Sequence, residues 1–250
     1  METTNPKGIS RLAVIPMRNH SSHDAPMNSQ ILFGEHYQVI EQKEDWLKVQ
    51  LVYDDSKGWI HQSQHSQISE EYFNQVNHSD YKVCTDLSGT IFFQKKKVQI
   101  LLGSILPITT NELFKMEEQI AYNGESKSLS LRREPDFLLE VLKLYEHAPL
   151  LPGGKTPFGI DAAAFVQQVY KLCGYKTPRY LEGLCQSGKS VASIAEIKVG
   201  DLIISDSLKS GFIAMEGGKC MGMYKGCVDK VPLDQISDSI IIRRILSENL

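Results

Sequence analysis

A glycine-rich loop that leads into an apolar helical pattern constrains the fold of this chain more than any other stretch. The loop reads Gly-Gly-Lys-Thr-Pro-Phe-Gly-Ile-Asp over residues 153–161, and three alanines follow it. Gly174 is a stop signal for a helix whose apolar positions recur at helical spacing, at Phe165, Val166, Val169 and Leu172. A helix N-terminus in such a position lowers the pKa of a thiol, because its dipole and free N–H groups favour the thiolate.

The same stretch resembles the active-site signature of the NlpC/p60 cysteine peptidases. These papain-like enzymes cut bacterial cell-wall peptides, often at γ-D-glutamyl–diaminoacid bonds. Where they read Asp-Cys-Ser-Gly-Phe, this chain reads Asp-Ala-Ala-Ala-Phe from Asp161 to Phe165. The resemblance therefore implies a papain-like fold, and it puts Ala162 at the position of the nucleophile. A methyl group cannot attack a carbonyl.

A peptidase of this class also needs an imidazole base beside the thiol. All seven histidines of the chain precede the signature stretch. The resemblance implies two family histidines on later strands, and one gap leaves their positions open. The first falls on Gly211 or Phe212, and the second falls on Gly222 or Met223. Neither alternative restores a base, so we expect Ala162 and these four positions to form a vestigial site.

The pocket around the signature also departs from the family. Pro-Tyr-Leu-Trp-Gly-Gly becomes Pro-Leu-Leu-Pro-Gly-Gly at 149–154, and Pro-Arg-Asp-Ala-x-Gln-Gln becomes Pro-Arg-Tyr-Leu-Glu-Gly-Leu at 178–184. The pocket aromatics and several polar residues are therefore replaced. What the resemblance still implies as pocket lining is Leu150, Pro152, Asp161, Ala163, Arg179 and Tyr180.

The N-terminal quarter reads as short strands separated by turns, which is typical of a small β-barrel. We expect these strands at residues 12–15, 31–34, 37–40, 46–52 and 58–60. The order Leu-Phe-Gly-Glu, Trp-Leu-Lys-Val, Gly-Trp-Ile resembles bacterial SH3-like domains, which commonly precede this type of peptidase. Trp46 and Trp59 are the only tryptophans, and we interpret them as barrel core rather than as a ligand site.

A degenerate second copy follows. Residues 100–103 echo 31–34, Ile108 corresponds to Val39, and residues 112–116 echo 45–49 after one deletion. Two copies are too few for a solenoid and favour tandem barrels. The predicted domains are thus an SH3-like barrel at 1–68, a second, degenerate barrel at 69–130 and an NlpC/p60-like domain at 131–250.

The last domain is predicted to combine helices with a sheet. Pro135 opens a helix whose apolar face is Phe137, Leu138, Val141, Leu142 and Tyr145. Closing strands are expected at 199–205, 212–215, 220–223 and 240–245. The fold class of the whole chain is therefore α+β, with two SH3-like β-barrels before a papain-like domain.

Composition excludes several classes of partner. The net charge is −3 and no dense basic patch appears, so neither nucleic acid nor an anionic membrane is favoured. Residues 1–7 lack the apolar region of a signal peptide, and no apolar run approaches membrane-spanning length. Five cysteines without paired spacing indicate reduced thiols. We expect a cytoplasmic protein without metal or cofactor.

One motif points to another class of protein. Residues 183–190 read Gly-Leu-Cys-Gln-Ser-Gly-Lys-Ser, which matches the phosphate loop of nucleotide-binding proteins. That loop works only between a buried strand and a long helix, because the helix N-terminus supplies N–H groups to phosphate. Residues 177–182 do not read as a buried strand, and the segment 191–196 is short for a helix.

The leading hypothesis is a pseudoenzyme that binds a cell-wall peptide or a protein partner, or serves as a scaffold. The alternative is an active cytoplasmic peptidase that recycles muropeptides with a non-standard nucleophile. For that alternative, Cys173 or Cys185 would replace the nucleophile, and His61 or His65 of the first barrel would supply the base. Nucleotide binding is the minor alternative.

Overall fold

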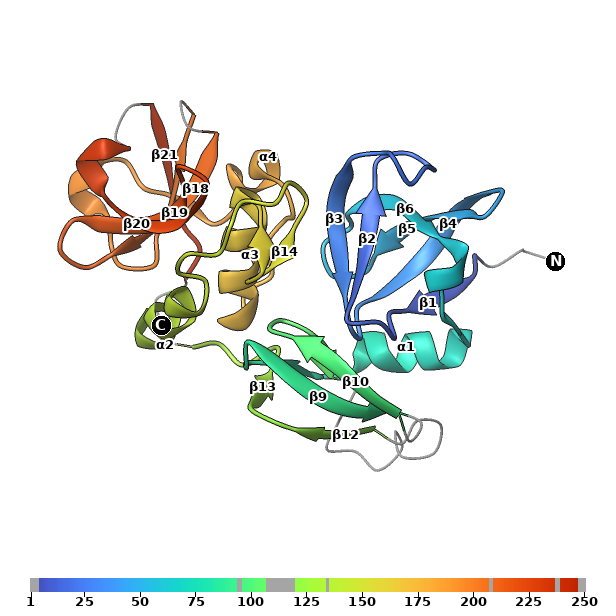
Figure 1. Cartoon of the computed structure of the whole chain (residues 1–250). Helices are drawn as coiled ribbons and strands as arrows, with labels where there is room; N and C mark the ends of the chain where they lie inside the picture. Colours follow the sequence, from blue (N-terminus) through green and yellow to red (C-terminus); the bar gives the residue numbers. More distant parts are fainter. Residues whose placement is uncertain are drawn as a thin grey trace. The chain divides into compact units, whose positions relative to one another are not determined.

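The computed structural model describes residues 5–93, 96–106, 120–133, 135–206, 209–236 and 239–246. The chain divides into two compact units, Met1–Ser130 and Leu131–Leu250 (Figure 1). Among the described residues, no helix combines the length and apolar character needed to cross a membrane.

The N-terminal unit begins with an antiparallel sheet in the order β3-β2-β6-β5-β4-β1-β7 (Figure 1). Its strands are β1 Lys7–Ile9, β2 Val14–Arg18, β3 Met27–Leu32, β4 His36–Lys43, β5 Trp46–Leu51, β6 Lys57–His61 and β7 Gln67–Ile68, with the 3₁₀ turn η1 at Gln62–Gln64. One face of the strands forms a central cluster of Ile15, Met17, Ile31, Tyr37, Val39, Leu47, Val49, Leu51 and Ile60.

The sequence predicted most of this sheet but misplaced two strands. The strand expected at 31–34 runs from Met27 to Leu32, because Gly34 has φ +78° and makes the turn that follows. The strand expected at 12–15 starts at Val14 and continues to Arg18. Helix α1, Glu70–His78, was not predicted, although Ser69 caps it by accepting from the Tyr72 N–H.

The described residues of the N-terminal unit also form two three-stranded sheets, β10-β9-β12 and β11-β8-β13. Their strands are β8 Lys82–Cys84, β9 Ser88–Phe93, β10 Lys96–Leu101, β11 Ile105–Leu106, β12 Ile120–Asn123 and β13 Ser126–Ser128. Gly103 has φ +84° and so repeats the turn made by Gly34. The echoes predicted at Ile108 and at 112–116 lie outside the described residues.

The two halves of this unit share a core contact. Phe33, from the end of β3, packs in one cluster with Cys84, Ile91, Ile100 and Leu106. The Ile105 N–H donates to the Phe33 carbonyl at 2.8 Å. This contact makes residues 5–130 one compact unit, while a domain boundary at residue 68 stays a prediction.

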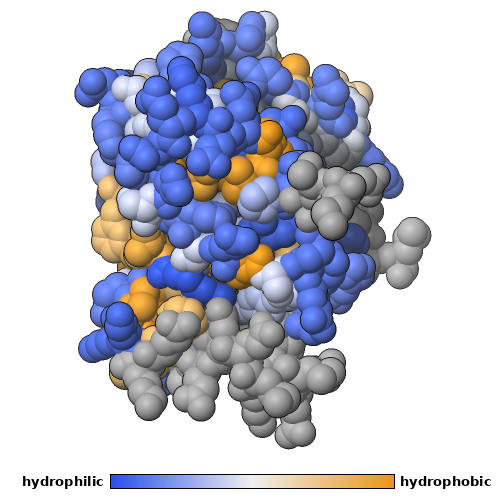
Figure 2. Space-filling view, turned by 90° about the vertical axis from the view of Figure 1, so that its right-hand side faces the viewer, coloured by the Kyte–Doolittle hydropathy of each residue, from blue (hydrophilic) through white to orange (hydrophobic). Residues whose placement is uncertain are grey.

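One side of the molecule is mostly polar. The side that Figure 2 turns to the viewer is largely hydrophilic, with hydrophobic residues in small separate patches. Single apolar side chains of this kind are normal on a soluble domain.

The C-terminal unit combines three helices with a six-stranded antiparallel sheet in the order β16-β21-β17-β18-β19-β20. The helices are α2 Pro135–Leu144, α3 Ala162–Leu172 and α4 Leu181–Leu184, with 3₁₀ turns at Ile194–Glu196 and Leu233–Gln235. The sheet contains β16 Lys189–Ser190, β17 Leu202–Ser205, β18 Ser210–Met215, β19 Lys219–Tyr224, β20 Cys227–Pro232 and β21 Ile240–Arg244, and a separate hairpin pairs β14 Lys155–Thr156 with β15 Gly159–Ile160.

Both predicted helices are confirmed. On α2 the predicted apolar face buries Leu138, Val141 and Leu142, and Tyr145 lies buried just after the helix. Helix α3 begins at Ala162 and ends before Gly174, whose φ is +85°. All four predicted closing strands are present, and β20 is an additional one. Helix α3 packs on β18 and β19, and this packing positions the candidate site (Figure 1).

Candidate functional site

The site is organised by the carboxylate of Asp161, which lies just before the first turn of α3. Its Oδ1 accepts a hydrogen bond from the Ala164 N–H at 2.7 Å, which caps the helix. Its Oδ2 accepts from the Gly153 N–H at 3.1 Å. One carboxylate therefore joins the glycine-rich loop to the helix and explains why α3 begins at Ala162.

Arg179 completes this arrangement from the segment after α3. Its guanidinium donates from Nη1 to Asp161 Oδ1 at 3.0 Å and from Nη2 to Oδ2. The Arg179 side chain is 1% exposed and the Asp161 side chain 21%, so the guanidinium is buried while the carboxylate is partly open to water. The guanidinium carbon also lies 5.4 Å from the centre of the Tyr180 ring. Asp161, Arg179 and Tyr180, predicted as pocket lining, are thus brought together.

Ala162 follows the cap and presents only a methyl group, which is half-buried. The neighbouring Asp161 carboxylate is already committed to the helix cap, the loop and Arg179. This end of α3 therefore carries the local structure of a nucleophile position without a nucleophilic atom.

The strands that face α3 decide between the alternative histidine positions. A Cβ built on Gly211 lies 2.8 Å from Cγ2 of Val166, so position 211 faces α3. Alternate residues of a strand share a face, so Ile213 lies on the same face of the sheet as Gly211. Ile213 pairs with Met221 on β19, and by the same alternation Met223 also lies on this face. Phe212 and Gly222 pair with each other and lie on the opposite face.

The opposite face is a separate apolar core. Phe212 is fully buried there in a cluster with Ile203, Ala214, Cys220, Val231, Ile236 and Ile242. A Cβ on Gly222 would lie 2.4 Å from the Gly211 carbonyl oxygen. Only Gly211 and Met223 of the four predicted positions therefore face the helix, and neither carries an ionisable group.

The remaining predicted lining residues differ in exposure. Leu150 is 49% exposed and forms a backbone bridge with Ile160, next to Asp161. Pro152 is exposed on the turn before Gly153, whereas Ala163 is buried against the body of the unit. Leu150 and Pro152 thus lie on the outer rim of this region, and Ala163 contributes to packing.

No cysteine of this unit is placed as a substitute nucleophile at Ala162. Cys173 is buried at the other end of α3, about 16 Å away along an 11-residue helix. Cys185 follows α4, and burial raises the pKa of its thiol, with the Glu182 charge adding to the shift. Burial raises the pKa of the Cys220 thiol to about 12. The thiols of Cys185 and Cys220 are therefore protonated at neutral pH.

One histidine belongs to the C-terminal unit. His147 is exposed after α2 and has φ +64°. Its backbone N–H donates to the Val228 carbonyl of β20, at the edge of the sheet beyond β19. Among the described residues, no group of three or more His, Cys, Asp or Glu side chains is arranged to hold a metal ion.

The phosphate-loop motif has the wrong geometry for phosphate. Its Lys189 and Ser190 form strand β16 and pair with β21, so no helix N-terminus follows the loop. Arg243 donates to the backbone carbonyls of residues 186, 187 and 188 at 3.1, 2.7 and 2.9 Å. The loop presents carbonyl oxygens to a cation rather than N–H groups to an anion, so the nucleotide-binding prediction is not supported.

A different group of residues was missed by the sequence analysis. Trp46 and Trp59 are both 8% exposed, as predicted, but neither belongs to the central cluster of the first barrel. Strand alternation could have revealed this, because Leu47, Val49 and Leu51 face the core. Trp46 is one residue before Leu47, so its side chain points to the opposite face of the strand. Trp46 lines a pocket instead.

Comparison with known proteins identifies both units. Residues 17–64 match the family described as the bacterial dipeptidyl-peptidase SH3 domain. Residues 148–244 match the NlpC/P60 family, over the same segment that builds the α3 site. The C-terminal unit carries an NlpC/P60 domain. The prediction of an SH3-like domain before a papain-like α+β domain is therefore confirmed.

Relatives with the same organisation extend this assignment. The γ-D-glutamyl-L-lysine dipeptidyl-peptidase of Bacillus subtilis is 23% identical over 224 residues, which cover 81% of this chain and 71% of the relative. The crystal structure of an NlpC/P60 family protein from Bacillus cereus superposes with a TM-score of 0.82 at 16% identity, covering 96% of this chain and all of that one. An NlpC/P60 endopeptidase from Photobacterium damselae gives 0.66 at 13% identity, covering 96% of this chain and 70% of the other.

Proposed function

We propose that this protein is a non-catalytic homologue of the γ-D-glutamyl-diaminoacid endopeptidases, with a role in binding or as a scaffold. The observation that carries the proposal is Ala162 at the capped N-terminus of α3, opposite Gly211 and Met223. Acyl transfer by this class of enzyme needs a thiolate and an imidazole within hydrogen-bond reach. Neither group stands at this NlpC/P60 site.

The retained parts of the site support a binding role. The Asp161–Arg179 pair holds the loop and the helix, while Leu150 and Tyr180 remain exposed beside it at 49% and 39%. A cell-wall peptide that carries a γ-D-glutamyl-diaminoacid bond is the proposed ligand, because a relative that aligns over most of this chain is named for its action on the γ-D-glutamyl-L-lysine unit. A protein partner is the second candidate occupant. All five cysteines are free, which agrees with the proposed cytoplasmic location.

The alternative is an active peptidase that recycles muropeptides with another nucleophile. The position of Cys173 at the far end of α3 and the raised pKa of Cys185 both oppose it. Nucleotide binding is opposed by the strand that follows the phosphate-loop motif.

The decisive experiment is a calorimetric titration of the purified chain with L-Ala-γ-D-Glu-diaminopimelate and with L-Ala-γ-D-Glu-L-Lys, followed by mass spectrometry of the recovered peptide. Saturable heat with intact peptide is the expected result. Cleavage would overturn the proposal. Absence of heat with intact peptide would refute peptide binding and leave the protein-partner role.

The Ala162→Cys variant separates loss of the nucleophile from loss of the whole catalytic group. We expect no cleavage by this variant, because the helix N-terminus can favour the thiolate but acyl transfer also needs an imidazole to pass the proton to the leaving amine. Ala163→Ser serves as the matched control for a polar atom added at the same helix end. Peptide cleavage by Ala162→Cys would show that a base is present and that only the nucleophile has been lost.

A further inference from the structure

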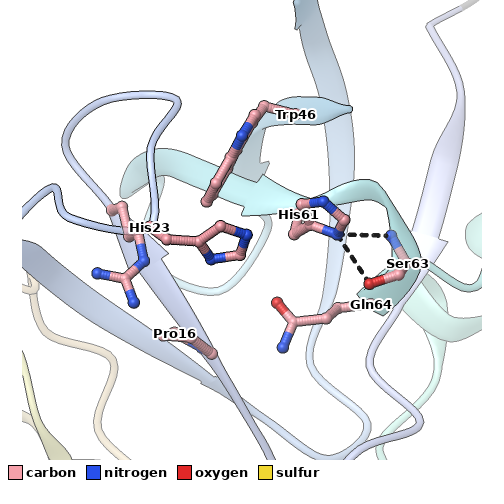
Figure 3. A pocket seen from close by; sticks show the side chains of 7 residues that line it. Pro16, His23, Trp46, His61, Ser63 and Gln64 are labelled. Atoms are coloured by element: carbon pink, nitrogen blue, oxygen red, sulfur yellow. Dashed lines mark hydrogen bonds between the residues drawn. The ribbon is translucent and has the colours of Figure 1, made fainter. Parts of the chain in front are cut away.

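A small pocket lies on the outer face of the first barrel, away from the NlpC/P60 domain in sequence. Its volume is about 130 Å³, and we call it the Trp46 pocket. Strand β2, the loop after it, the ends of β5 and β6, and turn η1 contribute its lining residues, which are Pro16, Arg18, His23, Trp46, His61, Ser63 and Gln64 (Figure 3).

Three aromatic rings form a fixed wall of the pocket. The ring centres of His23 and Trp46 are 4.9 Å apart, and those of Trp46 and His61 are 5.4 Å apart with the planes at 89°. The two imidazoles lie 5.2 Å from each other. Figure 3 shows these rings and Gln64 arranged around the same space. Trp46 is 8% exposed, so the wall is held by the barrel rather than by solvent contacts.

The polar groups of the pocket are mainly hydrogen-bond donors. Nη1 of Arg18 donates to the Ala25 carbonyl at 2.6 Å, which orients the guanidinium and leaves its other N–H groups available. The Ser63 backbone N–H donates to Nδ1 of His61 at 3.3 Å. The Ser63 hydroxyl also lies 2.8 Å from Nδ1, so Ser63 engages this nitrogen twice and Nε2 is the ring nitrogen assigned to a ligand.

Among the described residues, Arg18 has no anionic partner. No Asp or Glu is among the residues that line the pocket, and Arg18 makes no ion pair within the described part of the chain. A guanidinium binds a carboxylate with two parallel hydrogen bonds, and this geometry is stronger than a neutral contact. The apolar face of Trp46 suits a short hydrocarbon stem beside such a group.

We propose that the Trp46 pocket binds a small carboxylate, held by Arg18 and the His61 imidazole with its hydrocarbon part on Trp46. The volume of about 130 Å³ admits one carboxylate with a short stem and no larger ring system. The carboxylate belongs either to a free short-chain acid or to the C-terminus of a peptide. This site does not depend on the function proposed for the NlpC/P60 domain.

The test is a titration of the ¹⁵N-labelled full chain with sodium propionate at constant ionic strength, monitored by the two tryptophan indole N–H signals. Saturable displacement of the Trp46 signal, with the Trp59 signal unmoved, is the expected result. Parallel titrations with N-acetyl-alanyl-alanine and with its C-terminal amide show whether the carboxylate belongs to a free short-chain acid or to the C-terminus of a peptide. Tighter binding of the peptide acid than of propionate assigns a chain end, equal affinity assigns the free acid, and in both cases the amide should not bind.

Two variants test the assigned groups. Arg18→Gln should weaken propionate at least tenfold, whereas Lys48→Gln, which removes the cation 5.7 Å from the Trp59 ring, should leave the affinity unchanged. Arg18→Gln also removes the hydrogen bond from Arg18 to the Ala25 carbonyl, so a second variant is needed that leaves this bond in place. Gln64→Glu adds a carboxylate to the pocket and keeps Arg18. It should abolish binding, and Gln62→Glu on the same turn should not. Non-saturable shifts, or full affinity in Gln64→Glu, would overturn the proposal.

Discussion

At the scale of single residues, the start of α3 combines a well-bonded Asp161 carboxylate with the methyl group of Ala162. Asp161 and Arg179 form a bidentate pair in which the guanidinium is almost fully buried. Removing Arg179 leaves the Asp161 carboxylate, which is 21% exposed, without its cation, and this costs more than loss of a fully exposed pair. The pair is therefore a structural requirement of the α3 N-terminus, whether or not the site binds a ligand.

Arg179→Leu should lower the free energy of unfolding of the C-terminal unit by about 3 kcal/mol, because the Asp161 carboxylate loses its buried partner. Chemical denaturation followed by circular dichroism measures this change. Lys143→Leu is the matched control, since Lys143 pairs with Glu140 at 2.7 Å but is 60% exposed. Its loss should cost less than about 0.5 kcal/mol.

The double variant Asp161→Asn with Arg179→Leu checks the cause. Asparagine retains a helix cap and leaves no unpaired charge. The double variant should therefore lose less free energy of unfolding than the sum of the losses in the two single variants. Additive losses would contradict the assigned coupling.

At the scale of elements, the close approach of α3 to β18 and of β18 to β19 leaves little room for a side chain at Gly211 and Gly222. At Gly211 the obstacle is the Cγ2 methyl of Val166, 2.8 Å from a built Cβ. At Gly222 it is a backbone oxygen at 2.4 Å. A side chain end can move more easily than a strand backbone, so the two glycines differ in what they tolerate.

Gly222→Ala should therefore destabilise the C-terminal unit by about 2 kcal/mol, and Gly211→Ala by less. Differential scanning calorimetry on the full chain gives both values. Val166→Ala combined with Gly211→Ala should lose less than the sum of the single changes, because the contacting methyl is removed. The same Val166→Ala change should leave the destabilisation by Gly222→Ala unaltered. If Val166→Ala reduced the destabilisation by both glycine substitutions, the assigned contact with Gly211 alone would be contradicted.

At the scale of the whole molecule, the two units can be followed separately. Both tryptophans lie in the first barrel, so tryptophan fluorescence reports the N-terminal unit within the intact chain. That barrel also contains a buried neutral histidine. His36 is 2% exposed and donates from Nε2 to the Asn77 side-chain oxygen at 2.6 Å.

This histidine makes the N-terminal unit sensitive to acid. Burial lowers the pKa of His36 below its ordinary value, while in the unfolded chain the imidazole has a pKa of about 6.5. The unfolded state therefore binds protons first as the pH falls. The contribution of His36 to stability is complete above about pH 6.5 and is lost as the pH falls towards its folded-state value. Burial lowers the pKa of His65 as well, and it acts in the same direction.

The midpoint of urea unfolding, read by tryptophan fluorescence, should decrease between pH 7 and pH 5. His36→Gln should reduce this decrease, because glutamine keeps a donor for Asn77 and cannot be protonated. His78→Gln, at an exposed position of α1, should leave the decrease unchanged. An identical pH dependence in His36→Gln and in the unchanged protein would refute this assignment.

Several features of this protein were determined by the sequence alone, because they depend on neighbouring residues. The apolar spacing from Phe165 to Leu172 and the stop signal at Gly174 place α3 correctly, and alternation places most strands of the first barrel. That residue 162 carries no thiol is read directly from the sequence. Helix α1 was overlooked even though Ser69 and the acidic first turn were visible signals.

Only the tertiary structure decided which positions face each other. A shift of one residue along β18 or β19 moves a side chain to the other face of the sheet, so Gly211 and Phe212 could not be distinguished from the pattern. The sequence contains the phosphate-loop motif, but in the structure the end of this segment pairs with β21 and the loop carbonyls accept hydrogen bonds from Arg243. The Trp46 pocket joins residues from 16 to 64 that are separate in sequence, because neighbouring strands bring distant residues together and local periodicity carries no information about such contacts.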